Sequence, residues 1–265
     1  MIGYCANFSL TLSCFYTYSP HSCFTNRVLA TSVIQVEFRN YLLKALSAVD
    51  RQAFLPHLAE ISLERSQVLF EPGDTVEQVF FPSNAVLSIV TVMSDGHAVE
   101  SSTVGHESAA PLLWALSNVP SKSRVFAQIG GAAMRMPAAV LREKAGESPV
   151  LTAMLHRHAA SLAFQSEQGV ACNILHAAPA RLARWLLMTQ DRTGNRSLPL
   201  TQEYMSVMTG VQRTTISAVA NQLRSAGLIQ FSRGNVEIQD RPGLEAFACE
   251  CYRVIRTEFD GLHGR

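Results

Sequence analysis

Features that would mark a membrane-spanning or exported protein are missing from this sequence. Over its 265 residues, no apolar run reaches the ~18 to 20 residues that a membrane-spanning helix requires. No basic segment precedes an apolar stretch, since the first Lys or Arg is Arg27, and we therefore expect no export signal. These absences favour a globular, cytoplasmic protein. With 48% hydrophobic residues, the chain can bury a full core and is long enough for two domains.

Cysteine spacings typical of a metal site are also missing. No CxxC pair occurs, and no cysteine stands at the usual zinc-binding distance from a histidine, so we predict no metal site and reduced thiols. Cys249 and Cys251 are expected on one helix, where a separation of two residues points them to different sides. Nine-residue intervals between the first three cysteines leave a redox or iron–sulfur sensor as an alternative. The six are Cys5, Cys14, Cys23, Cys172, Cys249 and Cys251.

Motifs of the common enzyme classes do not occur either. The chain has no nucleophile elbow, no P-loop and no HExxH. His156, His158 and His176 follow one long helical pattern, at phases that do not converge on a metal. A lone histidine such as His97 or His106 is far more often a surface or hydrogen-bonded residue than a ligand. We therefore predict that the protein is not an enzyme.

The charge is small and unevenly distributed. Residues 176–265 hold 11 Arg and 8 Asp or Glu, a net charge of +3, and the remainder of the chain is at −2. A mildly basic C-terminal part fits a DNA-binding domain attached to a neutral sensor, although a solvated surface explains it as well.

Residues 200–235 have the spacing of a helix-turn-helix followed by a hairpin. Two short helical patterns meet at Gly210, where a tight turn needs the positive φ that glycine takes without strain. Strand patterns at 228–231 and 236–238 flank a turn at Arg233 and predict the wing of a winged helix. The alternative is an ordinary pair of helices joined at a glycine. The residues expected between the two helices are Met205, Val211, Ile216 and Val219.

The second of these helices is predicted to face DNA. Its outward side is short and polar with one arginine, Arg213, which suits the major groove because Arg can donate two parallel hydrogen bonds to guanine. Arg233 in the wing is predicted to contact a phosphate. The predicted DNA-binding residues are Gln212, Arg213, Thr214, Ser217, Ala218 and Arg233.

Between residues 68 and 136 the hydrophobic period changes to two, as in β-strands. Turn signals such as Pro72-Gly73-Asp74 separate the runs, and such regular intervals predict a small antiparallel β-barrel or jelly roll. An amphipathic helix or helix pair is expected before it, over 38–57, and a short helix on it, over 109–116. The fold class is therefore α+β. The predicted strands are 68–70, 79–81, 85–93, 97–104, 125–129 and 133–136.

One long helix is predicted from Leu151 to about His176. Positions 151, 155, 158, 162, 165 and 169 are spaced 4-3-4-3-4, as in a coiled-coil seam. A helix of ~25 residues is about 37 Å long, more than a small barrel can cover, so we predict a homodimer across a two-fold axis. The alternative is that this stripe packs on the protein's own barrel. The predicted dimer contacts are Leu151, Leu155, His158 and Leu162.

This order of segments resembles the Crp/Fnr superfamily of bacterial transcription regulators. The resemblance rests on EPGD (71–74) at the second strand, on the long helix and on TGVQRTTIS (209–217), and it covers about residues 40–260. A subgroup of that family is similar in two further stretches, GVACNILHAAPARLARWLLMTQDR (169–192) and ACECYR (248–253). The resemblance implies a homodimer that reads a palindromic operator under the control of an effector, with RNA polymerase as a possible further partner.

The resemblance also implies roles for single residues. The recognition helix would be residues 212–225, with Arg213 at the position that reads guanine. Thr214 stands where the family often has Glu, and Ala218 replaces a base-contacting Arg. A DNA-binding function is therefore implied, but not the operator of the cyclic-AMP-binding members.

The sensor departs further from the cyclic-nucleotide-binding members of that family. They carry a Gly-Glu pair for the ribose and an Arg-Ser pair for the cyclic phosphate, where this chain has Ala110-Pro111 and Lys122-Ser123. The ribose carboxylate is lost, and a bidentate Arg becomes at best a point-charge Lys. Cyclic AMP is therefore not expected, and the effector stays unknown. Candidate effector-binding residues, with a solvated loop as the alternative for the last three, are Glu107, Ala110, Lys122, Ser123 and Arg124.

We divide the chain accordingly. Residues 1–38 form a leader expected to lack a fold, 39–137 a cyclic-nucleotide-binding-like sensor, 138–176 a linker and dimerisation helix, and 177–265 a winged-helix DNA-binding domain. The main rival interpretation is a ligand-binding or redox sensor module, with an iron–sulfur cluster or haem, whose winged helix serves protein contacts.

Overall fold

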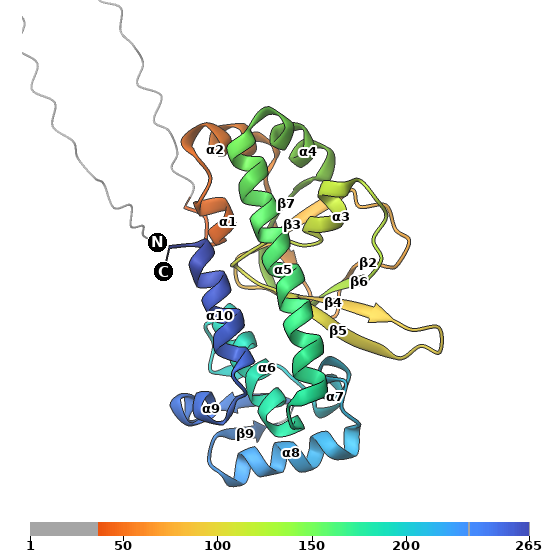
Figure 1. The fold of residues 1–265 in the computed structure, drawn as a ribbon, viewed down its shortest axis with the longest axis vertical. Coiled ribbons are helices and arrows are strands. Elements are labelled where there is room, and N and C mark those ends of the chain that lie inside the picture. The colour runs from red at the N-terminus through yellow and green to blue at the C-terminus, as the bar shows by residue number, and fades with distance from the viewer. Residues whose placement is uncertain (1–36, 233, 265) are drawn as a thin grey trace, which may run out of the picture. The chain divides into compact units, whose positions relative to one another are not determined.

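Two short helices begin the part of the chain that the computed structural model describes, residues 37–232 and 234–264 (Figure 1). The predicted leader, with Cys5, Cys14 and Cys23, thus lies almost wholly outside the described residues. The helices are α1 (Tyr41–Lys44) and α2 (Ala48–Phe54), followed by the 3₁₀ turn η1 (Leu55–His57).

Both helices begin at polar capping residues. The side chains of Asn40 and Ser47 accept hydrogen bonds from backbone N–H groups at the start of α1 and α2. Phe54 at the end of α2 is fully buried. Val49, an apolar residue of the segment predicted as an amphipathic helix, is 77% exposed, because the helix breaks between α1 and α2 and the helical period restarts.

Seven strands form two antiparallel sheets. The first has the order β1-β7-β3 and the second β2-β6-β4-β5. No ladder among the described residues joins the two sheets, so the strands do not close into the predicted barrel. β2 is only three residues long, and its register with β6 shifts between Val68 and Phe70, which leaves little edge for closure. The strands are β1 (Ala59–Leu63), β2 (Val68–Phe70), β3 (Gln78–Pro82), β4 (Val86–Val92), β5 (Ala98–Val104), β6 (Arg124–Ile129) and β7 (Gly131–Pro137).

Three helices follow or interrupt the sheets. α3 (Leu112–Ser117) overlaps the predicted 109–116 segment and ends one residue beyond it, α4 (Ala138–Glu147) follows β7, and α5 (Pro149–Leu175) is 27 residues long. α5 runs down the molecule in front of the strands in Figure 1. None of the helices in the described ranges combines the length and apolar composition needed to span a bilayer.

The predicted dimer seam of α5 is buried inside the chain itself. Leu151, Leu155, His158 and Leu162 are 1%, 0%, 1% and 7% exposed, and α5 packs on α3, α4, β5 and α10. These four side chains are not available to a second copy, so the prediction of dimer contacts there is wrong and the stripe packs on its own molecule. The length argument failed because two further helices, α4 and α10, lie along α5 and extend the surface it covers.

The C-terminal part is the predicted winged helix with additional helices around it. A three-stranded sheet of order β8-β10-β9 forms the wing. The predicted final helix over 242–261 is broken at residues 248–250 into two helices. The elements are α6 (Ala178–Thr193), β8 (Ser197–Leu198), α7 (Gln202–Thr209), α8 (Arg213–Ser225), β9 (Ile229–Ser232), β10 (Asn235–Ile238), α9 (Arg241–Phe247) and α10 (Cys251–Leu262).

The β-sheet part and the winged helix belong to one compact unit that begins at Glu37. The predicted boundary between 176 and 177 falls between α5 and α6. α6 packs on α7, α8, α9 and α10, and α7 packs on β5. The winged helix is therefore held against the strands of its own chain.

Candidate nucleic-acid interface

The turn between α7 and α8 is built by short-range contacts. Gly210 ends α7 with a φ of 63°, in the left-handed region that glycine adopts without a side-chain clash. Ser206 donates a hydrogen bond from its Oγ to the carbonyl oxygen of Val211. The Thr201 hydroxyl accepts one from the backbone N–H of Tyr204 at the start of α7. Local sequence thus fixes the angle between the two helices.

The facing sides of the two helices are buried, as their spacing predicts. Met205 and Ile216 are fully buried, and Val211 and Val219 are 8% and 5% exposed. Burying such a side chain contributes ~1.5–3 kcal/mol. These contacts hold α8 on α7 by one face and leave the other face free.

The free face of α8 carries most of the predicted DNA contacts. Gln212, Arg213, Thr214 and Ala218 are all exposed. Gln212 is the N-cap and Arg213 the first helical residue, so the guanidinium adds its charge to the positive end of the helix dipole. The first turn of α8 therefore offers the donors and the positive charge that a guanine edge or a phosphate requires.

Two of the predicted contacts stand apart from this face. The partly exposed Ser217 donates from its Oγ to Gln202 Oε1 over 2.8 Å and is also bonded to the carbonyl oxygen of Arg213. Ser217 therefore links α8 to α7, a contact that the sequence did not predict. Arg233 lies outside the described residues; its neighbour Gly234 has a φ of 84°.

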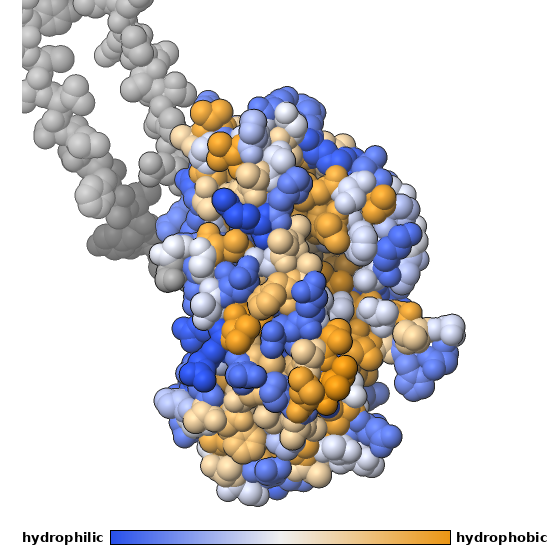
Figure 2. All heavy atoms as spheres, viewed as in Figure 1, coloured by the Kyte–Doolittle hydropathy of each residue, from blue (hydrophilic) through white to orange (hydrophobic). Residues whose placement is uncertain are grey.

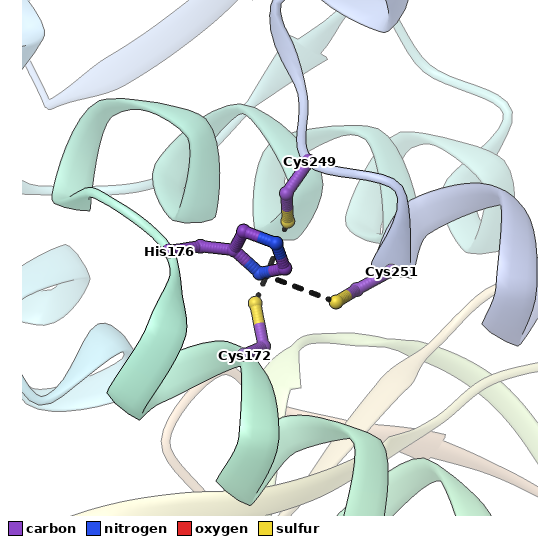
Figure 3. Close-up of side chains that lie close together, drawn as sticks. All are labelled: Cys172, His176, Cys249 and Cys251. Atoms are coloured by element: carbon purple, nitrogen blue, oxygen red, sulfur yellow. Dashed lines mark hydrogen bonds between the residues drawn. The ribbon is translucent and has the colours of Figure 1, made fainter.

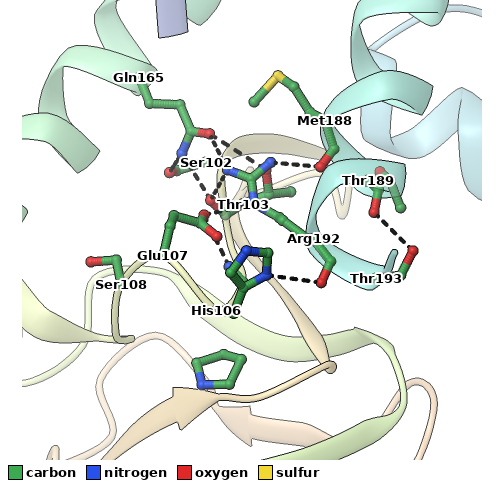
Figure 4. Close-up of polar contacts among 12 residues, drawn as sticks. Ser102, Thr103, His106, Glu107, Ser108, Gln165, Met188, Thr189, Arg192 and Thr193 are labelled. Carbon is green, nitrogen blue, oxygen red and sulfur yellow. Dashed lines mark hydrogen bonds and ion pairs between the residues drawn. The ribbon is translucent and has the colours of Figure 1, made fainter. Parts of the chain in front are cut away.

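A buried ion pair joins the strand region to the winged helix (Figure 4). Arg192 near the end of α6 places its Nε 2.7 Å from Oε1 of Glu107, in the turn after β5, and both side chains are under 10% exposed. Burial opposes ionisation of Glu107, but Arg192 and then His106 outweigh it, so the pKa of this carboxyl lies below its ordinary value. The pair is therefore charged at neutral pH.

Three further hydrogen bonds engage both terminal nitrogens of Arg192. Its guanidinium donates to the carbonyl oxygens of Met188 and Thr103 and to Oε1 of Gln165 on α5. Gly105 allows this close approach, because an added Cβ there would lie 2.5 Å from the Cγ of Arg192. One guanidinium thus joins β5, α5 and α6.

A second link between β5 and α6 is made by Trp185, which precedes Arg192 by seven residues on α6. Glu100 on β5 accepts hydrogen bonds from Trp185 Nε1 over 2.8 Å and from Ser88 Oγ over 2.7 Å. Burial nevertheless raises the pKa of Glu100 to about 7, against the two donors. This carboxyl can change charge near neutral pH while it bridges β5 and α6.

The helix-turn-helix turn itself lies beside β5. A Cβ added at Gly210 would come within 3.6 Å of Val99 Cγ1, and Met208 on α7 lies 3.8 Å from the Ser88 hydroxyl on β4. A shift of β5 would therefore reach the base of the recognition helix directly.

The candidate effector-binding residues do not converge on one place. Glu107 is engaged by Arg192, and Arg124 shares its Nε between both carboxylate oxygens of Glu71, at 3.0 and 2.9 Å. Lys122 is exposed, whereas Ala110 is fully buried and pairs through its backbone with Phe80. Only Ser123 lines a cavity next to α3.

That cavity has a volume of about 130 Å³ and lies between α3, the sheet β4–β5 and α5. Its polar groups are the hydroxyls of Ser101, Ser102, Ser123 and Ser166, and Trp114 and Leu112 are among its apolar walls. None of the described residues that line it is charged. Such a cavity suits a small, largely uncharged group better than a phosphate.

Comparisons with known proteins identify the C-terminal part by sequence. Residues 180–247 match the Crp-like helix-turn-helix domain family. A search of curated proteins finds no match to the chain.

Solved structures resemble the chain over both of its parts. A transcriptional regulator of the crp/fnr family from Eubacterium rectale superposes with a TM-score of 0.62 at 16% identity, covering 78% of this chain and 98% of that one. FixK2 from Bradyrhizobium japonicum gives 0.60 at 16% identity, covering 72% and 98%. The c-di-GMP responsive regulator CLP from Xanthomonas campestris gives 0.60 at 12% identity, covering 73% and 100%.

The two lines of comparison agree, because the matched domain contains α7, α8 and the wing and the superpositions extend that match to the strands and α5. The chain therefore carries a Crp-like helix-turn-helix domain and shares its fold with these regulators of the Crp/Fnr family.

Proposed function

We propose that the protein acts as a homodimer that reads a palindromic operator, with its DNA affinity set by an effector that acts on the strand region. The observation that carries this is the exposed first turn of α8, with Arg213 at the positive end of the helix. Regulators of this family are not enzymes, which agrees with the missing catalytic motifs.

A face of α5 other than the predicted seam supports dimerisation. Ala153, Ala160, Ala163, Val170 and Ile174 are exposed and follow one another at spacings of three, four or seven residues. Val170 and Ile174 are 62% and 76% exposed, and Figure 2 shows apolar residues over α5, gathered toward its C-terminal half. The alanines in the first part of this face allow two such helices to approach closely across a two-fold axis, and Val170 and Ile174 near the C-terminal end of α5 supply apolar area for the contact.

The contacts between β5 and the winged helix supply a route for control. A ligand in the cavity beside α3 would contact Ser101 and Ser102 on β5. The turn after this strand carries Glu107, which is paired with Arg192 of α6. Repacking there would change the position of α6 and with it the separation of the two recognition helices. Binding of a palindrome requires that separation to match half-sites ~34 Å apart.

The nature of the cavity further supports an effector other than cyclic AMP. Arg124 is held by Glu71, Lys122 points into solvent, and the described lining is uncharged. A cyclic phosphate there would lose charge-assisted contacts worth roughly 1.5–3 kcal/mol each. RNA polymerase as a partner stays an expectation of the family resemblance.

The experiment is selection of an operator from random DNA, followed by salt-titrated binding of Arg213→Ala and Arg233→Ala. If Arg213 reads a base, its loss costs about 1–3 kcal/mol and relaxes preference at one base pair in each half-site. If Arg233 contacts a phosphate, its loss weakens all sites alike and lowers the salt slope by about one.

Thr215→Ala is a matched control, since Thr215 is exposed on the same turn of α8 and is not a predicted contact. Recovery of no preferred sequence by the wild-type protein would refute operator reading and favour the rival in which the winged helix binds protein. A uniform loss for Arg213→Ala with unchanged preference would move base reading to Gln212 and Thr214.

A further inference from the structure

Four potential metal ligands from two distant segments meet beside the winged helix (Figure 3). Cys172 and His176 lie at the end of α5, and Cys249 and Cys251 lie in the break between α9 and α10. The three sulfurs and one histidine nitrogen all fall within 4.8 Å of one another. In Figure 3 the His176 ring faces the three thiols.

The break in the C-terminal helix makes this arrangement possible. Glu250 is the N-cap of α10, so Cys249 precedes the helix and Cys251 is its first residue. The expectation that the two point to different sides of one helix is therefore wrong. On α5, Cys172 and His176 are one turn apart, and the N–H of His176 still bonds to the Cys172 carbonyl oxygen, which brings both side chains to the same side.

The distances fit one tetrahedral ion. At tetrahedral angles, Zn–S bonds of about 2.3 Å and Zn–N bonds of about 2.0–2.1 Å place two sulfurs about 3.8 Å apart, and a sulfur and a nitrogen about 3.5 Å apart. The Cys172 and Cys249 sulfurs are 3.4 Å apart, and Cys251 Sγ is 3.5 Å from His176 Nδ1. An iron–sulfur cluster holds its own sulfides between several irons and needs cysteine sulfurs spread further apart.

Neighbouring groups provide the support that metal ligands usually have. The other nitrogen of His176, Nε2, lies 3.9 Å from the Glu250 carboxylate, too far for a hydrogen bond but on the side where zinc proteins often place a carboxylate next to a ligating histidine. Gln168 donates from Nε2 to Cys251 Sγ over 3.0 Å. Arg184 of α6 interacts electrostatically with Cys172 and Cys249, and its buried Nε has no hydrogen-bond partner within the described residues.

We propose that Cys172, His176, Cys249 and Cys251 bind one Zn²⁺ ion that joins the end of α5 to the start of α10. Three thiolates and one imidazole fill all four positions of a tetrahedral ion, so the site is closed and structural. Its net charge of −1 is balanced by Arg184. The ion ties the long helix to the segment that leaves the winged helix, and this inference does not rest on the proposed operator binding.

The test measures metal in the full chain, purified without metal affinity resin and under reducing conditions. One zinc per chain is expected, and Co²⁺ put in its place should show the visible bands of a tetrahedral thiolate complex. Cys172→Ser and His176→Ala should each lower Co²⁺ affinity at least tenfold in competition with a chelator. Gln168→Ala removes no ligand and should weaken Co²⁺ binding about tenfold. This variant keeps the test valid if the ligand variants fail to fold.

Matched controls are available in the same chain. His156→Ala changes an exposed histidine of α5, and a Cys5/Cys14/Cys23→Ser variant removes the other three thiols; both should keep the metal. Iron with inorganic sulfide, a Cys172–Cys249 disulfide under reducing conditions, or equal Co²⁺ binding by the wild-type protein and Cys172→Ser would each overturn the assignment.

Discussion

Replacing Glu107 by Gln tests whether the buried ion pair with Arg192 joins the two parts of the chain. The substitution keeps the shape of the side chain and leaves a guanidinium, 7% exposed, without its counterion. Removing one member of a buried pair costs about 3–5 kcal/mol. The other three acceptors of Arg192 are neutral, so they offset little of that cost.

Urea unfolding of Glu107→Gln, Arg192→Met and the double variant measures the coupling. Each single change should lower the free energy of unfolding by about 3 kcal/mol or more, while the double variant should lose about 2 kcal/mol less than the sum of both. Because the folded-state pKa of Glu107 is lowered, the stabilisation is fully present above the unfolded pKa, near 4.5, and disappears as the pH falls below it.

The exposed pair Arg124–Glu71 is the matched control. Its side chains are 40% and 43% exposed, so Arg124→Met should cost less than about 1 kcal/mol. A loss below 1 kcal/mol for Glu107→Gln, or additive effects in the double variant, would refute the view that this pair couples the strands to the winged helix.

Two further changes test the dimer face and the second link. If the proposed dimer forms through the exposed face of α5, Ile174→Glu should convert it to monomers in light scattering, because the change places a charge on that face. Val49→Glu, at an equally exposed position on α2, should not, and a dimeric Ile174→Glu protein would rule out this face. Glu100 has a folded-state pKa of about 7, raised from 4.5, so its contribution to stability is fully present below pH 4.5 and is lost as the pH rises through 7. The wild-type free energy of unfolding should therefore fall by on the order of 2 kcal/mol from pH 5 to 8 relative to Glu100→Gln, and parallel pH profiles of the two proteins would show that burial of Glu100 is not the cause.

Local signals in the sequence predicted the winged helix well. The positive φ of Gly210, the caps of α7 and the buried side of α8 all depend on residues within a few positions of one another. Six of the seven strands of the two sheets follow from the period of two. β1 was missed because four of its five residues are exposed or only partly buried, and Leu63 alone is buried.

Long-range contacts explain what the sequence could not reveal. The stripe on α5 was interpreted as a dimer seam because nothing in residues 151–175 indicates that α10 will lie beside them. His158, predicted as a polar residue of the dimer seam, is instead 1% exposed inside its own chain, and burial lowers its pKa to about 4. Cys172 and Cys249 are 77 positions apart, and a spacing rule for zinc sites cannot detect ligands that only the folded chain brings together.

The helix break at residues 248–250 also determines how the winged helix is tethered. After the break, α10 turns back along α5, and His263 near its end reaches the carbonyl oxygen of Glu107 at 3.1 Å. The segments that carry the winged helix are thus anchored at both of its ends, where the chain enters through α6 and where it leaves through α10. A domain on one hinge can swing in any direction, but a domain on two can only rock about the line that joins them. Any allosteric movement of the recognition helix in this protein is therefore restricted to one arc, and removal of the last turn of α10 should widen that arc.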